Sequence, residues 1–311
     1  MAVVMAALVA AGTAVFATAP GAGSTVRPIR ATPRPSTKAP AVIAGSYVAL
    51  GDSYTSGPAI PTQLGPDTTP PAPADCLRSS ENYPSLTARA LGLQLVDVSC
   101  GGATTDDVDR AQGAGIPAQR SALRRTTALV TIGIGGNDLG FSTLATNCAS
   151  YTPWGPTRVG WSCQAHYTTG GVDQLSTAVA RVGVKVAGVL AQVRERSPGA
   201  KVFVIGYPDI LPPTGSGCWP SLPFRVGDLN FLRGVEARLN AALASAAAGA
   251  GDHYVDMATP SETHSACAAP ATRWVEGVLH PAQSYPLHPD ATGMAAMAAV
   301  LESAMESTGT R

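Results

Sequence analysis

The sequence has little charge and few aromatic side chains. Charged residues make up 14% of the 311 positions, and 21 basic residues balance 21 acidic ones, so the formal net charge is zero. A nucleic-acid-binding surface or an anionic membrane partner favours an excess of basic residues, and this balance argues against both. Aromatic residues make up only 5%, which leaves few rings for stacking. Hydrophobic residues make up 45%, enough for a sizeable core.

The sequence also lacks two patterns that would point to other chemistry. Its six cysteines form no C-x-x-C pair, and no histidine stands at zinc-finger spacing from them, which argues against a structural metal site. No Gly-x-Ser-x-Gly sequence lies near the end of an expected strand, so the nucleophile elbow of the α/β-hydrolases is not the right template. We expect neither a metal nor an organic cofactor.

The first 44 residues differ in composition from the rest. Residues 1–23 hold a short apolar stretch with an Ala-Thr-Ala sequence at 17–19, a pattern typical of signal-peptidase sites. We predict an export signal, with a retained N-terminal anchor as the alternative, because no lysine or arginine precedes the apolar stretch. Residues 24–44 are rich in proline and predict a disordered linker, which leaves residues 45–311 as the folded domain.

The cysteines indicate an oxidising environment. An even number of cysteines behind an export signal predicts three disulfides. The sequence alone leaves every pairing open. All six lie in the expected domain, at Cys76, Cys100, Cys148, Cys163, Cys218 and Cys267.

Short apolar runs rich in β-branched residues alternate with helical patterns. Strands are expected at 47–51, 94–98, 128–134, 201–205 and 253–256. Helices are expected at 82–91, 172–196, 226–248 and 290–307. This alternation predicts an α/β fold with a parallel sheet covered by helices on both faces. In such sheets, ligands bind at the carboxyl ends of the strands.

Candidate functional residues follow the first three expected strands. Ser53 follows Gly-Asp directly after the first strand, where a turn into a helix can expose a nucleophilic hydroxyl. Gly102 lets the backbone approach a ligand and offers an N–H to an oxyanion, and Asn137 offers a side-chain amide for the same purpose. Taken alone, each also fits a plainer role: a helix cap or phosphate-binding turn for the serine, and ordinary turns or caps for the other two.

The candidate general base is His288, in the sequence Pro-Leu-His-Pro-Asp. The two prolines restrict the backbone around this histidine, and a helix is expected to begin just after it. His280 also precedes a proline and is the main rival. No such frame surrounds the other histidines, which are His166, His253 and His264.

Together, Ser53, Gly102, Asn137 and His288 resemble the four sequence blocks of the SGNH hydrolase superfamily, also called the GDSL family. The resemblance covers roughly residues 45 to 305, which is the whole folded part. The Gly-Asp-Ser-Tyr-Thr-Ser-Gly segment and the six cysteines are most similar to the secreted actinobacterial branch, which includes Streptomyces-type lipases and esterases. The resemblance implies a flavodoxin-like three-layer α/β/α sandwich around a five-stranded parallel sheet.

The resemblance also implies roles and pairings. Ser53 would be the nucleophile and His288 its base. The oxyanion hole would consist of the N–H groups of Ser53 and Gly102 and the side chain of Asn137. The disulfides of that branch pair sequentially, which implies Cys76–Cys100, Cys148–Cys163 and Cys218–Cys267.

One position departs from the family pattern. Many members have an aspartate three residues before the catalytic histidine, where this chain has Tyr285. We therefore expect a Ser–His dyad in which the backbone carbonyl of Tyr285 accepts the Nδ1 proton of His288. Asp290 is the alternative partner, although its place at the start of a helix suits interaction with the helix dipole.

These expectations lead to a secreted carboxylesterase or lipase that hydrolyses lipid or other carboxylic esters, phospholipids included, through an acyl-enzyme. A carbohydrate esterase that removes acetyl groups from polysaccharide is the alternative, and a non-catalytic surface-binding module of the same fold is the alternative from another class. The domain is expected to be monomeric, to bind no nucleic acid and to insert stably into no membrane. The aromatics expected at the rim of the site suit an acyl groove, a sugar or simple loop packing. They are Tyr54, Tyr151, Trp154, Trp161 and Trp219.

Overall fold

The computed structural model describes residues 45–149, 151–152, 155–156, 162–215, 217–279 and 281–310. The predicted export signal and linker lie outside these described residues, as do Trp154, Trp161 and His280 and the side chain of Tyr151.

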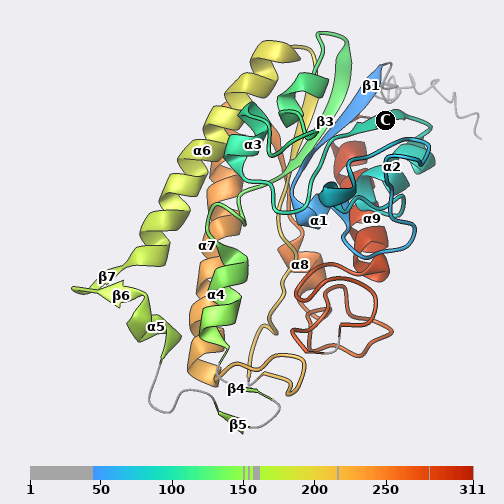
Figure 1. The fold of residues 1–311 in the computed structure, drawn as a ribbon. Coiled ribbons are helices and arrows are strands. Elements are labelled where there is room, and N and C mark those ends of the chain that lie inside the picture. The colour runs from blue at the N-terminus through green and yellow to red at the C-terminus, as the bar shows by residue number, and fades with distance from the viewer. Residues whose placement is uncertain are drawn as a thin grey trace, which may run out of the picture. The chain divides into compact units, whose positions relative to one another are not determined.

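A five-stranded parallel sheet forms the centre of the domain (Figure 1). Its strands lie in the order β2–β1–β3–β8–β9, and each neighbouring pair is parallel. Every strand begins and ends within one residue of the position that the apolar runs predict, so the predicted sheet is confirmed. The strands are β1 (Ser46–Gly51), β2 (Gln94–Asp97), β3 (Thr127–Gly133), β8 (Lys201–Ile205) and β9 (His253–Val255).

Long helices cover both faces of the sheet, which confirms the predicted three layers (Figure 1). Helices α6 and α7 pack on one face, whereas α2 and α9 pack on the other. Each begins and ends within two residues of the predicted helix, because strong apolar periodicity carries across several turns. The bounds are α2 (Tyr83–Leu91), α6 (Gln174–Arg196), α7 (Val226–Ala250) and α9 (Ala291–Ser307).

Shorter elements fill the connections between these layers. They span too few residues to show a hydrophobic period, so the sequence did not predict them. The helices are α1 (Ser53–Ser56), α3 (Thr105–Asp109), α4 (Phe141–Cys148), α5 (Cys163–His166) and α8 (Ala258–Ser261), with 3₁₀ turns η1 (Ala74–Cys76) and η2 (Gln119–Ala122). Two small hairpins pair β4 (Tyr151–Thr152) with β5 (Gly155–Pro156) and β6 (Thr168–Thr169) with β7 (Val172–Asp173).

Strand β1 has buried side chains on both of its faces, which is why its sequence is apolar without alternation. Val48 and Leu50 belong to the core cluster shared with α6 and α7, whereas Tyr47 and Ala49 belong to the cluster shared with α2 and α9. Because β1 packs against helices on both faces, its carboxyl end has little freedom to move, and the turn that follows is fixed at that end.

Helix α6 is, in the described part of the chain, the one helix long and apolar enough to cross a membrane by length and composition. In this fold its buried residues recur at helical spacing, as Val179, Val182, Val186 and Val189 show. These valines belong to the core cluster that also contains α7 and one face of the sheet.

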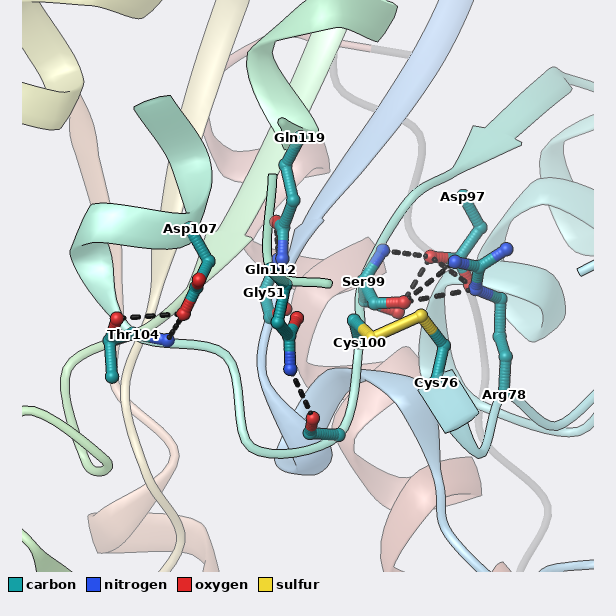
Figure 2. Close-up of a disulfide and its surroundings, with 11 residues drawn as sticks. Gly51, Cys76, Arg78, Asp97, Ser99, Cys100, Thr104, Asp107, Gln112 and Gln119 are labelled. Atoms are coloured by element: carbon teal, nitrogen blue, oxygen red, sulfur yellow. Dashed lines mark hydrogen bonds and ion pairs between the residues drawn. A yellow bond between two sulfur atoms is a disulfide. The ribbon is translucent and has the colours of Figure 1, made fainter. Parts of the chain in front are cut away.

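Three disulfides join the loops and short helices that connect the main elements. Their pairs are the sequential ones that the resemblance implies: Cys76–Cys100, Cys148–Cys163 and Cys218–Cys267. The Cys76–Cys100 bond ties η1 to the segment that follows β2 (Figure 2).

Candidate active site

The segment after β1 places Ser53 at the carboxyl end of the sheet. Gly51 has a φ of 156°, and a Cβ there would lie 2.7 Å from the carbonyl oxygen of Gly133, so a side chain is excluded. Asp52 donates its N–H to that same carbonyl at 3.0 Å and caps α1 by accepting the Tyr54 N–H at 2.9 Å. Ser53 is the first residue of this one-turn helix.

A buried glutamine from a distant segment fixes the end of β1. The Gln119 side chain accepts the N–H of Gly51 and donates to its carbonyl, both at 2.8 Å (Figure 2). Both backbone groups of the residue where the strand ends are therefore satisfied in the core. This arrangement holds the serine turn from the sheet side.

Gly102 lies in the segment after β2, between two residues that contact the other parts of the site. Cys100 donates its N–H to Gly51 at 3.0 Å, and the carbonyl of Ala103 accepts the Asn137 side chain at 2.9 Å. Gly102 has a φ of 75° and is exposed. Within the described residues, the amides of Ser53 and Gly102 have no protein acceptor, so both can donate to a ligand.

Asn137 lies in the turn after β3 and lines the same cavity as Ser53. The turn is fixed to the serine turn through Tyr207, whose hydroxyl accepts the Gly136 N–H at 2.8 Å and donates to Asp52 at 2.5 Å. Burial raises the pKa of the Asp52 carboxyl to about 7. One tyrosine therefore connects the segment that carries Ser53 to the segment that carries Asn137.

His288 approaches Ser53 from the loop that precedes α9. Its Nε2 lies 2.8 Å from Ser53 Oγ, and its Nδ1 lies 2.8 Å from the carbonyl oxygen of Pro286. A carbonyl can only accept a hydrogen bond, so Nδ1 carries the proton and Nε2 is left as the acceptor for the serine hydroxyl. This is the tautomer that a general base requires.

The carbonyl beside His288 differs from the expected one. The Tyr285 carbonyl accepts the backbone N–H of His288 at 3.1 Å, whereas the Pro286 carbonyl faces the imidazole ring. The chain turns at Leu287, which has a φ of 60°, and this left-handed conformation brings the carbonyl two residues before the histidine to Nδ1. The predicted Tyr285 contact with Nδ1 is therefore wrong, although the partner is a backbone carbonyl as expected.

Asp290 takes no part in orienting the imidazole. It is the N-cap of α9, and its carboxylate accepts the N–H of Gly293 at 2.8 Å. Burial raises the pKa of this carboxyl. The carboxylate of Asp290 therefore caps α9, the helix that follows His288.

The segment from Arg273 to Asp290, here called the histidine loop, contains no helix or strand among its described residues. Glu276 holds it by accepting the Leu287 N–H at 3.1 Å and donating its own N–H to the His288 carbonyl at 2.9 Å. The buried Glu276 side chain also lies 2.5 Å from Arg273.

Tyr54 connects the histidine loop to the serine turn. Its hydroxyl donates to the carbonyl of Leu287, and its ring centroid lies 5.0 Å from that of His288. A left-handed leucine costs roughly 1–2 kcal/mol. The bonds that Leu287 makes through both of its backbone groups offset that cost and keep His288 beside Ser53.

Burial lowers the pKa of His288 below its usual value, an effect that the hydrogen bond to Pro286 partly opposes. The imidazole is therefore neutral, and able to accept a proton, down to a more acidic pH than an exposed histidine.

A cavity of about 380 Å³ opens beside Ser53, Asn137 and His288. Most of its wall is apolar. Its apolar lining includes Phe141, Ala145, Ile210, Leu239, Val278 and Leu287. Glu236 adds one buried carboxyl that accepts the Ile210 N–H at 2.8 Å, and burial raises its pKa to about 8. Such a cavity suits an apolar chain.

Other candidates from the sequence lie elsewhere. His166 ends α5, His253 lies in β9, and His264 bonds to Thr272 and stacks on Trp274. Trp219 is 52% exposed and does not line the cavity. Among the described residues, no group of three or more His, Cys, Asp or Glu side chains is arranged to hold a metal ion.

Sequence reasoning missed several residues that build the site. Tyr207 and Gln119 act across long sequence separations, and no local pattern marks such contacts. Tyr54 was expected only as a rim aromatic, although it is 8% exposed and bonds to the histidine loop. The one available signal was its position directly after the serine.

Comparison with known proteins identifies the family. The model of the GDSL-like Lipase/Acylhydrolase family matches residues 49–296. The chain is 40% identical over 254 residues to Lipase 2 of Streptomyces coelicolor, covering 81% of this chain and 83% of the relative.

Two solved structures are similar over most of the domain. The phospholipase A1 of Streptomyces albidoflavus is 30% identical with a TM-score of 0.66, covering 84% of this chain and 99% of that one. The extracellular lipase of Streptomyces rimosus is 28% identical with a TM-score of 0.65, covering 84% and 100%. The chain therefore belongs to the GDSL-like lipase and acylhydrolase family, and it is a carboxylic ester hydrolase.

Proposed function

We propose that the protein is a secreted carboxylesterase or lipase that cleaves lipid esters through an acyl-enzyme on Ser53, with His288 as its base. The observation that carries this proposal is the continuous set of contacts from Ser53 Oγ to His288 Nε2 and from His288 Nδ1 to Pro286, each 2.8 Å long. This geometry supports proton transfer from the hydroxyl to a correctly oriented imidazole.

In the first step, Ser53 Oγ attacks the ester carbonyl carbon while His288 takes the hydroxyl proton. The negative charge that develops on the carbonyl oxygen accepts hydrogen bonds from the N–H groups of Ser53 and Gly102 and from the Asn137 side chain. His288 then gives its proton to the leaving alcohol, and the acyl group stays on Ser53.

In the second step, His288 takes a proton from water, and the resulting nucleophile attacks the acyl carbon. The same donors stabilise the second tetrahedral intermediate, which collapses to the carboxylic acid and free Ser53. The positive charge on the imidazolium is stabilised by the Pro286 carbonyl in place of a carboxylate, so the catalytic unit is a dyad.

The apolar cavity supports lipid esters as the substrate class. A wall built by Phe141, Ile210 and Leu239 removes an acyl chain from water, and each buried methylene contributes about 0.8 kcal/mol. The similar proteins named lipase and phospholipase A1 point the same way. Three disulfides and the similarity to an extracellular lipase support export of the protein.

The test is hydrolysis of p-nitrophenyl esters of increasing acyl length, of phospholipids and of acetylated xylan, with Ser53→Ala as the blank. We expect medium or long acyl chains to be preferred and activity to disappear in the variant. Unchanged hydrolysis by Ser53→Ala would show that the nucleophile is a different residue. A preference for acetyl esters together with acetate release from the polymer would instead support the carbohydrate esterase.

A fluorophosphonate probe separates the enzyme from a binding module of the same fold. The probe needs an activated serine, so we expect it to label native protein and to leave Ser53→Ala unlabelled. Absence of labelling in folded native protein would favour the binding module.

A further inference from the structure

Gln112 lies in the loop after α3, with its side chain directed at the backbone of the segment that holds Gly102 (Figure 2). Its Nε2 donates to the carbonyl oxygen of Gly101 at 2.8 Å. The residues that contact an ester are not the only ones that decide the geometry of an oxyanion hole, because its backbone donors must themselves be held in place.

The bond to Gly101 controls the direction of the next amide. The peptide unit between Gly101 and Gly102 is planar and trans, so its C=O and its N–H point in opposite directions. A side chain that holds the carbonyl on one side therefore aims the Gly102 N–H to the other. Neither glycine has a Cβ that would restrict rotation of this unit.

The N–H of Gly101 has a different partner from its carbonyl. Its N–H donates to the carbonyl of Cys76 at 2.9 Å, and the Cys76–Cys100 disulfide joins the same two segments (Figure 2). These contacts fix where the segment lies. The Ala103 N–H closes the turn over both glycines by donating to the Cys100 carbonyl at 3.1 Å, a bond that type I and type II turns share. The two turn types differ in the orientation of the central peptide unit, and Gln112 bonds to the carbonyl of that unit.

Gln112 is itself fixed in its loop. Its N–H donates to the Ile116 carbonyl at 3.2 Å, and Ile116 bonds back to Gly113 at 3.1 Å. The Gln112 Oε1 atom is buried without a hydrogen-bond partner in the described structure. A buried oxygen without a hydrogen-bond partner lowers stability. Among the described residues, the side-chain amide of Gln112 therefore makes its one favourable polar contact through Nε2, with the Gly101 carbonyl.

We propose that Gln112 is a positioning residue of the oxyanion hole, which acts by holding the Gly101 carbonyl so that the Gly102 N–H faces the reacting oxygen. The inference rests on the proposed function, in which that N–H is an oxyanion donor. Gln112 itself does not touch the substrate.

The test compares an ester with the matching thionoester in the native enzyme and in Gln112→Met, which keeps the length of the side chain but has no donor. Sulfur is a weak hydrogen-bond acceptor, so the thionoester gains little from the oxyanion hole. We expect kcat for the ester to fall about 10-fold or more, toward the 10²–10³ that loss of a donor costs, with KM almost unchanged. Thionoester cleavage should change by less than about 3-fold.

Gln63→Met is the matched control, because Gln63 also donates from its Nε2 to backbone carbonyls, those of Gly57 and Ile60, at 2.9 and 2.8 Å. It serves the loop after α1 rather than the Gly102 segment. Loss of this bond should leave the ratio of ester to thionoester rates at the native value. If Gln112→Met does not fold, Gln112→Leu provides the same comparison, since its side chain also has no donor and adds no charge.

The outcomes separate this inference from the proposed function. Equal losses on ester and thionoester, or an unchanged kcat in Gln112→Met, would overturn the role of Gln112 while Ser53→Ala still abolishes activity. Retention of activity in Ser53→Ala would instead overturn the proposed function. A selective loss on the ester supports both.

Discussion

The two sides of the cavity are built in different ways. The side proposed to bind the oxyanion, here called the oxyanion side, has Ser53 and Asn137 in the cavity wall and Gly102 in the segment after β2. It follows the ends of three neighbouring strands and is held by buried side chains such as Gln119 and Tyr207. The histidine loop has no helix or strand among its described residues and is held by backbone hydrogen bonds and by side-chain contacts of Glu276 and Tyr54.

The difference shows which contacts fix the positions of Ser53 and His288. Ser53 inherits its position from β1, whose side chains are buried on both faces. His288 obtains its position from a strained leucine and from Tyr54, which belongs to the opposite side of the cavity. The histidine loop is thus positioned in part by the residue next to Ser53.

Loss of a donor on the oxyanion side is expected to have the largest effect. Asn137→Ala should lower kcat by about 10²–10³ with little change in KM, because the amide acts mainly in the transition state. Steady-state kinetics on a p-nitrophenyl ester measure this. Asn137→Asp keeps the shape but removes the donor, and a kcat close to native in that variant would contradict the assignment.

Loss of the Tyr54–Leu287 hydrogen bond, which connects the two sides, should lower kcat by less than loss of the Asn137 donor. Tyr54→Phe deletes only the hydroxyl that donates to Leu287, and we expect kcat to fall about 10-fold as the imidazole loses its fixed position. Pre-steady-state acylation rates give the direct measurement.

The matched control for Tyr54 is Tyr47→Phe. The Tyr47 hydroxyl is also buried, but it bonds to Thr131 in the core at 2.8 Å. Both variants should lose a similar amount of stability, and Tyr47→Phe should keep kcat within about 2-fold. Equal kcat values in Tyr54→Phe and Tyr47→Phe would contradict a role of the Tyr54 hydroxyl in positioning His288.

The acidic limb of the pH profile is expected to report the protonation of His288. Because burial lowers the pKa of His288, its neutral form persists below the usual value of 6.5, and the acidic limb of kcat/KM should have its midpoint below that pH. Activity therefore falls only when the pH drops through the lowered pKa. A midpoint at or above 6.5 in a kcat/KM profile would contradict the expectation that a His288 of lowered pKa sets the acidic limb.

The smallest effect is expected for the aspartate beside the histidine. Asp290→Asn should keep kcat within about 3-fold, because asparagine is also a good N-cap and the Pro286 carbonyl still orients the imidazole. A kcat loss near 10⁴-fold, as when a triad aspartate is neutralised, would show that the carboxylate supports His288 after all.

The amino-acid sequence by itself determined the architecture. Apolar runs and helical periodicity are local signals, and they located the five strands and four long helices within two residues. Since parallel strands present their carboxyl ends at one edge, the same signals predicted that Ser53, Gly102 and Asn137 would lie near one another.

Only the tertiary structure decided how these residues are held. The partner of His288 depends on the conformation of Leu287, and a one-residue change in where the chain turns replaces the Tyr285 carbonyl with that of Pro286. Gln119 and Tyr207 reach their partners across segments that are distant in the sequence. Such contacts follow from how the packed layers bring loops together, and packing between distant segments leaves no periodic trace in the sequence.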